Sequence, residues 1–208
     1  MANHLHKGDL PAGLDLGPAV AVDCETMGLK LARDRLCLIQ LSSGDGNAHL
    51  VQFPRDAEAP FDAPNLSAML ADSRVLKLFH FGRFDLAAIE RYLGVMCAPV
   101  YCTKIASKLC RTFTDRHSLK DLVRELLGID LSKAQQTSDW GAAELTAEQL
   151  SYAASDVLYL HGLKAKLDAM LAREGRADVA DACFRFLPHR ARLDLLGWGD
   201  DADIFAHH

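Results

Sequence analysis

The sequence lacks the features of membrane-spanning, repetitive and disordered proteins. No apolar run approaches the roughly 18 residues that a transmembrane helix requires, and residues 1–8 contain no apolar segment of the signal-peptide type. Low-complexity segments and internal repeats are also absent. These absences lead us to expect a globular protein of the cytoplasm.

A cysteine pattern typical of zinc sites is missing as well. The chain has six cysteines, none of them in a C-x-x-C pair, and most lie in apolar or strand-like surroundings. We therefore expect reduced thiols in the core rather than disulfides or a zinc site.

Basic residues are not in excess, since 23 lysines and arginines stand against 28 aspartates and glutamates and the formal net charge is −5. This balance argues against a protein that coats long nucleic acid by bulk electrostatics, but not against a nucleic-acid substrate held at one site. Residues 104–120 are locally basic, with Asp115 as the only opposing charge. The basic stretch is either a solvated helix face or a phosphate-binding surface.

The order of secondary-structure patterns predicts an α/β fold with a mixed central sheet flanked by helices. Apolar runs bounded by turn residues predict strands at 20–23, 36–41, 48–53 and 75–79, the first three as an antiparallel meander. Helical spacing predicts helices at 84–93, 105–109, 119–127 and from about 147 to 171. We expect a single domain over residues 1–208, with a core at about 19–171 and a C-terminal helix and tail at 172–208.

Two carboxylates one residue apart, Asp23 and Glu25, close the first apolar strand. Residues two apart on a strand project to the same face, so the two side chains bring like charges together. Such a pair is costly unless a cation lies between its members, and hard oxygen ligands suit Mg²⁺ or Mn²⁺. A solvated strand edge is the alternative for this pair taken alone.

Asp85 follows the predicted strand at 75–79, at the start of a predicted helix. Open α/β sheets place their ligand sites beyond the carboxyl ends of strands, although helix-dipole stabilisation also selects an aspartate here. Tyr152 and Asp156 lie one turn apart on a later helix, so both can approach a single point. This helix is largely apolar, and a buried aspartate needs a partner or a metal; a structural hydrogen bond between the two residues is the alternative.

Taken together, these motifs resemble the DEDDy exonucleases, the ribonuclease D-like group with a ribonuclease H-like fold. The matching positions are Asp23, Glu25, Asp85, Tyr152 and Asp156. Within that group the chain looks like the compact bacterial nano-RNase C family. The resemblance covers nearly the whole chain and is carried by residues 22–26, 34–46, 79–86, 102–108, 138–140 and 195–198.

The resemblance implies a metal-dependent 3′-5′ exonuclease with two divalent ions, Mg²⁺ or Mn²⁺. Two such ions about 4 Å apart activate a water and neutralise charge on the phosphate. By resemblance, Asp23 and Asp156 hold the ion that binds the water, Glu25 adds to that site, Asp23 also bridges to the second ion, and Asp85 fixes the substrate side. Tyr152 orients the water, because a phenol with a pKa near 10 is a poor base at neutral pH.

The resemblance also implies a short RNA substrate, a diribonucleotide above all, and a homo-oligomeric ring, an octamer in that family. Activity on DNA is compatible with the same site. An apolar wedge between bases and donors for the 5′ phosphate are needed for such a substrate. The substrate-binding candidates are Met27, Leu29, His80, Lys104, Lys108, Arg116, His117 and Lys120. Ordinary surface charge is the alternative for each basic residue, and a hydrogen-bonded core histidine is the alternative for His80.

The C-terminal segment is apolar for a tail and either covers a neighbouring subunit or packs on its own. Its apolar residues are Leu193, Leu195, Leu196, Trp198, Ile204 and Phe205.

Two other functions remain open: a ribonuclease D-like processor of RNA 3′ ends or a DNA exonuclease, and a catalytically silent nucleic-acid-binding scaffold. Buried like charges argue against the scaffold, because a scaffold gains nothing from them.

Overall fold

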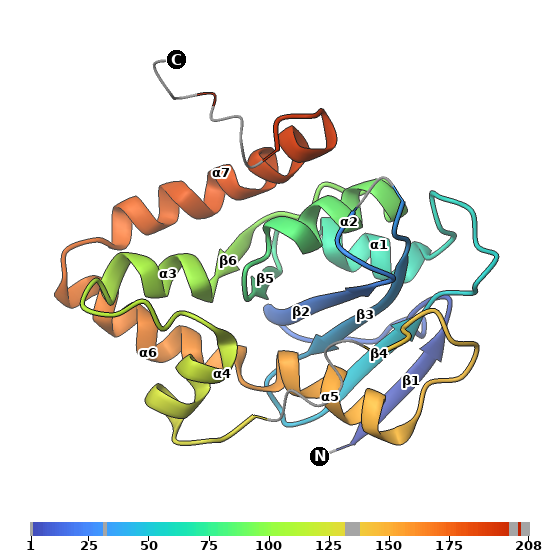
Figure 1. Ribbon diagram of the computed structural model, residues 1–208, viewed down its shortest axis with the longest axis horizontal. Coiled ribbons are helices and arrows are strands. Elements are labelled where there is room, and N and C mark those ends of the chain that lie inside the picture. Colours follow the sequence, from blue (N-terminus) through green and yellow to red (C-terminus); the bar gives the residue numbers. More distant parts are fainter. Residues whose placement is uncertain (1, 31–32, 132–137, 200–203, 205–208) are drawn as a thin grey trace.

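The computed structural model describes residues 2–30, 33–131, 138–199 and 204. Within these residues a six-stranded sheet has the order β1-β4-β3-β2-β5-β6 (Figure 1). Its strands are β1 (Asn3–Lys7), β2 (Ala19–Thr26), β3 (Leu36–Ser42), β4 (Ala48–Gln52), β5 (Leu76–Phe79) and β6 (Val100–Cys102). As predicted, β2, β3 and β4 form an antiparallel meander; β5 and β6 continue the sheet in parallel from β2.

Strand β1 is absent from the sequence-based prediction. Most of its residues are exposed, so it carries no hydrophobic pattern. A parallel ladder to β4 holds it in place, from Asn3 opposite Ala48 to Lys7 opposite Gln52. Backbone pairing with a neighbour that is distant in the sequence therefore forms this strand where side-chain propensity does not.

Helices cover both faces of the sheet. They are α1 (Pro64–Ala71), α2 (Arg83–Leu93), α3 (Thr103–Cys110), α4 (Leu119–Leu122), the π-helical turn η1 (Val123–Leu127), α5 (Ala147–Leu158), α6 (Leu160–Arg173) and α7 (Ala177–Leu195). Helix α5 packs on β2, β3 and β4, and α2 packs on β2 from the other side and on α7 (Figure 1). No helix in the described part of the chain is both long and apolar enough to cross a membrane.

The long helix predicted at about 147–171 is two helices. Tyr159 separates α5 from α6, with φ of −107° and ψ of −4°. The two helices have different partners, because α5 lies on the sheet and α6 packs on α3. The predicted end of the helix at 119–127 is confirmed, since Gly128 adopts the left-handed conformation there.

The core surrounds the central strands. Every residue of β3 is buried, since α5 covers one of its faces and strands flank it on both sides. The six cysteines are free thiols, five of them buried, as expected from the sequence. At the C-terminal end, Leu195 packs partly against the core, whereas Leu196, Trp198 and Ile204 are exposed. Phe205 lies outside the described residues.

Candidate active site

Five polar side chains from three elements surround one cavity of about 480 Å³. They are Asp23 and Glu25 of β2, Asp85 of α2, and Tyr152 and Asp156 of α5. The parallel pairing of β2 with β5 places the start of α2 beside the end of β2, and α5 reaches the same point across the sheet. The structure thus brings together all five residues that the sequence singles out.

Three of the carboxylates form a compact cluster. Asp23, Glu25 and Asp156 each offer one oxygen, and these oxygens lie within 4.8 Å of one another. Carboxylate oxygens at this spacing are the donor set that Mg²⁺ or Mn²⁺ prefers. The cluster can therefore hold a divalent cation.

Asp85 lies at the edge of this cluster and is tied to β2. Its Oδ1 accepts a hydrogen bond of 3.0 Å from the backbone N–H of Cys24, the residue between the two strand carboxylates. The Cys24 side chain is itself buried and also lies against the Asp85 carboxyl. A backbone donor thus fixes the position of the fourth carboxylate.

Burial raises the pKa of all four carboxyls, and repulsion from neighbouring carboxylates adds to the rise at Asp23, Glu25 and Asp85. Burial is the largest cause at each of them, and it raises the pKa of Glu25 to about 9 and the pKa values of Asp85 and Asp156 to about 7. For Asp23, burial and then the neighbouring carboxylates raise the pKa well above its usual value. Without a bound cation, the ionised state of these carboxylates is therefore unfavourable.

Helix α5 carries Tyr152 and Asp156 at a fixed position. Thr146 and Gln149 form a capping box at its start, and the Gln149 side chain also donates to the Asp139 carbonyl at 3.2 Å. The buried Trp140 ring lies 6.2 Å from the Tyr152 ring, centroid to centroid. Burial, and then the charge of Asp156, raise the pKa of the Tyr152 phenol.

The start of α2 is fixed by a close approach and an ion pair. A Cβ at Gly82 would lie 2.5 Å from the Cβ of Phe79, so only glycine allows the chain to turn from β5 into α2 here. Arg83 then donates from Nε to Asp194 of α7 at 2.6 Å. These contacts hold Asp85 in the first turn of α2.

The structure divides the eight predicted substrate-binding residues into two groups. Leu29, His80, Lys104 and Lys120 line the cavity. His80 is also a hydrogen-bonded histidine, with Nδ1 2.9 Å from the Thr103 hydroxyl, and burial lowers its pKa to about 3.

The other four residues lie outside the cavity lining: Met27, Lys108, Arg116 and His117. Met27 is 54% exposed beside Gly141, and Lys108 is exposed on α3. Arg116 pairs with Glu125 at 3.6 Å, and His117 Nδ1 lies 2.8 Å from the Ser107 hydroxyl.

Sequence reasoning missed five lining residues: Phe81, Phe84, Ser118, Leu119 and Leu131. For Phe81 and Phe84 a signal exists, because they flank Gly82 and Arg83 in the connection between the fourth predicted strand and Asp85. Such connections carry ligand-binding residues in open α/β sheets.

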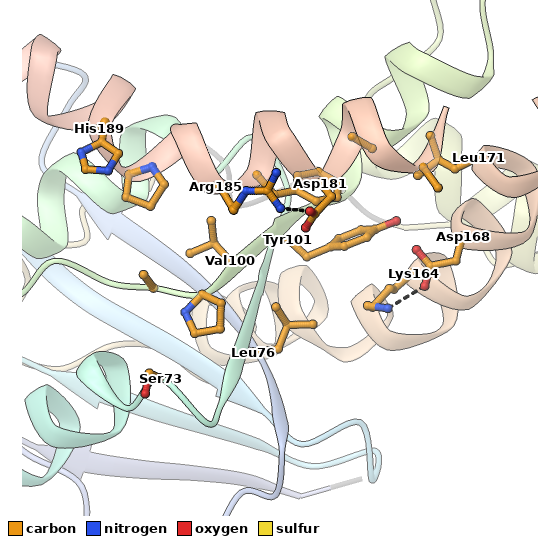
Figure 2. Close-up of a pocket in the computed structure, with 16 residues that line it drawn as sticks. Ser73, Leu76, Val100, Tyr101, Lys164, Asp168, Leu171, Asp181, Arg185 and His189 are labelled. Atoms are coloured by element: carbon orange, nitrogen blue, oxygen red, sulfur yellow. Dashed lines mark hydrogen bonds and ion pairs between the residues drawn. The ribbon is translucent and has the colours of Figure 1, made fainter. Parts of the chain in front are cut away.

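A second cavity of about 810 Å³ lies apart from these residues, between β6, α6 and α7 (Figure 2). Its wall is mostly apolar and includes Val100, Tyr101 and Phe184. Two ion pairs within helices stand at its border, Lys164 with Asp168 and Arg185 with Asp181. None of the five candidate site residues lines it.

Comparison with known proteins assigns the class. The model of the 3′-5′ exonuclease family matches residues 9–172. The chain therefore belongs to the 3′-5′ exonuclease family. This finding confirms the enzyme class and, with the observed sheet, the ribonuclease H-like fold expected from the sequence.

Three similar proteins refine this assignment. Brucella melitensis NrnC bound to pGG superposes with a TM-score of 0.95 at 53% identity, and the match covers 100% of both chains. The same protein with bound Mg²⁺ gives a TM-score of 0.94 at 52% identity over 100% of both chains. Ribonuclease D of Acidiphilium cryptum is 36% identical over 192 residues, which are 86% of this chain and 47% of that protein. The chain thus spans about half the length of this curated relative.

Proposed function

We propose that this chain is a metal-dependent 3′-5′ exoribonuclease that hydrolyses short RNA, preferably diribonucleotides, to mononucleotides. The convergence of Asp23, Glu25 and Asp156 within 4.8 Å, in the same cavity as Asp85 and Tyr152, is the observation that carries the proposal. The similarity of the chain to an NrnC bound to pGG, and to the same protein with bound Mg²⁺, supports the choice of substrate and metal.

The positions of the side chains support a proposed role for each of them. Two divalent ions would supply a water of lowered pKa and neutralise charge on the phosphate. Asp23, Glu25 and Asp156 would hold a divalent ion, and Asp85, fixed by the Cys24 N–H, would support the substrate side. Tyr152 keeps its proton at neutral pH and orients the attacking water, because an ordinary phenol is a poor base there.

The size and lining of the cavity favour a short substrate. Its volume of about 480 Å³ falls within the roughly 300–1,000 Å³ of small-molecule sites. Leu29 is 85% exposed at its border and can enter between two bases, and Lys104 and Lys120 can bind phosphate. Met27, Lys108, Arg116 and His117 are not part of this proposal.

A second candidate function is the trimming of longer RNA 3′ ends, and the ribonuclease D relatives favour it. The chain spans only part of those relatives, so this activity stands second. DNA hydrolysis at the same site is a further alternative. A silent scaffold is disfavoured, because one buried and three half-buried carboxyls with raised pKa destabilise a protein that does not use them.

We also propose a cytoplasmic, homo-oligomeric enzyme, octameric by family resemblance. Six free thiols suit a reducing compartment. Exposed Leu196, Trp198 and Ile204 at the C-terminal end suit a subunit contact. Light scattering during size-exclusion chromatography measures the mass directly, and a monomeric mass would refute the oligomer.

The experiment that tests the function compares end-labelled RNAs of two to about twenty nucleotides, and matched DNAs, with Mg²⁺, Mn²⁺ or EDTA. We expect metal-dependent release of mononucleotides, with the dinucleotide turned over fastest. Asp23→Asn should abolish the activity, whereas Asp178→Asn, an exposed aspartate of α7, should preserve it. Efficient trimming of long RNA with neglect of the dinucleotide would favour the second candidate. Loss of activity in both variants would argue against the assigned site.

A further inference from the structure

An exposed phenylalanine beside the carboxylate cluster adopts an unusual backbone conformation. Phe81 has a φ of +64°, and among the described residues it alone combines a positive φ with a side chain. Its Cβ makes this left-handed region unfavourable, and bulky residues rarely occupy it. The residue is also 51% exposed. Neither backbone preference nor burial therefore explains a phenylalanine at this position.

Contacts on both sides prevent the backbone of Phe81 from relaxing. The preceding His80 is half-buried and its Nδ1 lies 2.9 Å from the Thr103 hydroxyl. The following Gly82 is packed so closely on Phe79 that a Cβ would lie 2.5 Å from the Phe79 Cβ. The chain thus holds Phe81 at the cavity that Asp23, Glu25 and Asp85 also line. Strain that is fixed in this way is typical of functional sites.

A cation accompanies the Phe81 ring. Lys104 of α3 places its Nζ 4.1 Å from the ring centroid, and Lys104 lines the same cavity. The ammonium group is attracted by the face of the ring, which orients both side chains. An aromatic ring next to a cation is a combination that binds a nucleotide, because the base stacks on the ring and the phosphate pairs with the cation.

We propose that Phe81 is a stacking platform for one base of the substrate and that Lys104 binds a phosphate of the same substrate. The inference rests on the proposed function and names how its site recognises the nucleotide. Stacking accepts every base, since each has a π face, so the platform contributes affinity without base preference. Phe81 is a substrate-binding residue and takes no part in the proton transfers.

The test compares variants that separate the ring from the backbone strain. Phe81→Gly removes the ring and permits the positive φ, Phe81→Ala removes the ring alone, and Phe81→Tyr keeps a ring. Phe113→Ala is the matched control, because Phe113 is 75% exposed with Arg111 5.8 Å from its centroid and lies outside the cavity lining. The substrates are the shortest RNA that the wild type degrades and two analogues that each lack one base near the 3′ end.

We expect Phe81→Gly and Phe81→Ala to raise KM for the intact RNA by about tenfold to a hundredfold with little change in kcat, as loss of one stacked base implies. Phe81→Tyr and Phe113→Ala should retain the wild-type KM. On the analogue that lacks the stacked base, wild type and Phe81→Gly should have equal KM values. The melting temperature of Phe81→Gly should be at least that of the wild type, which separates stacking from stability.

Two results would overturn the inference. One is an unchanged KM for Phe81→Gly on the intact RNA; the other is an equal rise in KM on the intact RNA and on both base-lacking analogues. Failure of the wild type to degrade any RNA with Mg²⁺ or Mn²⁺ would instead refute the proposed function. The two failures are therefore distinguishable.

Discussion

Replacing Glu25 with glutamine should stabilise the protein in the absence of divalent metal. Glu25 is largely buried among the other carboxyls, and its pKa is raised from the usual 4.5 to about 9. A pH of 7.5 lies three units above the pKa of 4.5 that Glu25 has in the unfolded chain. Each unit corresponds to about 1.4 kcal/mol of free energy of unfolding. The upper limit of the destabilisation is therefore about 4 kcal/mol, and we expect Glu25→Gln to recover about 2–4 kcal/mol of it.

The sign of this effect fixes its pH dependence. Because the folded state binds the Glu25 proton more tightly than the unfolded chain, stability is greatest below pH 4.5 and falls as the pH rises toward 9. Glutamine does not ionise, so this decline should be smaller in the variant. The two proteins should therefore differ little near pH 4.5 and most above neutrality.

Urea denaturation in EDTA at several pH values measures the difference, and Glu58→Gln is the matched control because Glu58 is exposed. Added Mn²⁺ should reverse the order, since the ion neutralises the carboxylates and stabilises only the protein that binds it well. The reasoning is refuted if Glu25→Gln in EDTA is no more stable than the wild type at pH 7.5, or if Mn²⁺ stabilises both proteins equally.

Three further variants test other parts of the site. Tyr152→Phe should reduce kcat and keep most of the Mn²⁺-induced rise in melting temperature; a loss of that rise as large as in Asp23→Asn would contradict the positioning role. Thr146→Ala should lower the free energy of unfolding by about 1 kcal/mol, because it removes the capping hydrogen bond at the start of α5. An unchanged free energy of unfolding in urea denaturation would contradict this role of Thr146. Gly82→Ala should impair both stability and activity, since the new Cβ would overlap Phe79; a fully active, equally stable variant would show that the turn can shift.

Much of the fold could be predicted because side-chain periodicity determines it. The strands of the meander are apolar runs bounded by turn residues, and β3, buried throughout, gives the strongest such signal. Gly128 ends its helix in the left-handed conformation, as its position after a periodic segment indicates. Strand β1 was missed, since its exposed residues have no pattern and its pairing with β4 joins segments that are distant in the sequence.

The five site residues were found because each is a chemically unusual group at a topologically informative position. A carboxylate on a buried strand, or on a largely apolar helix, destabilises the fold unless a partner or a metal compensates its charge. Such a carboxylate can be recognised in a sequence by its apolar neighbours. The substrate-binding residues offered no such signal. Lys104 and Lys108 lie on the same helix and look alike in sequence, yet only Lys104 lines the cavity, because Lys108 lies one turn further along α3, where it is exposed.

Backbone geometry accounts for the part of the site that sequence patterns cannot show. Asp85 is fixed by the N–H of Cys24, a group that every residue except proline has, so no residue type identifies it. Phe81 reaches the cavity because the Phe79–Gly82 contact and the His80 hydrogen bond impose a positive φ, not because phenylalanine favours that conformation. A sequence pattern can therefore locate the groups that ionise, whereas the backbone decides which neighbours they meet and which ring reaches the cavity.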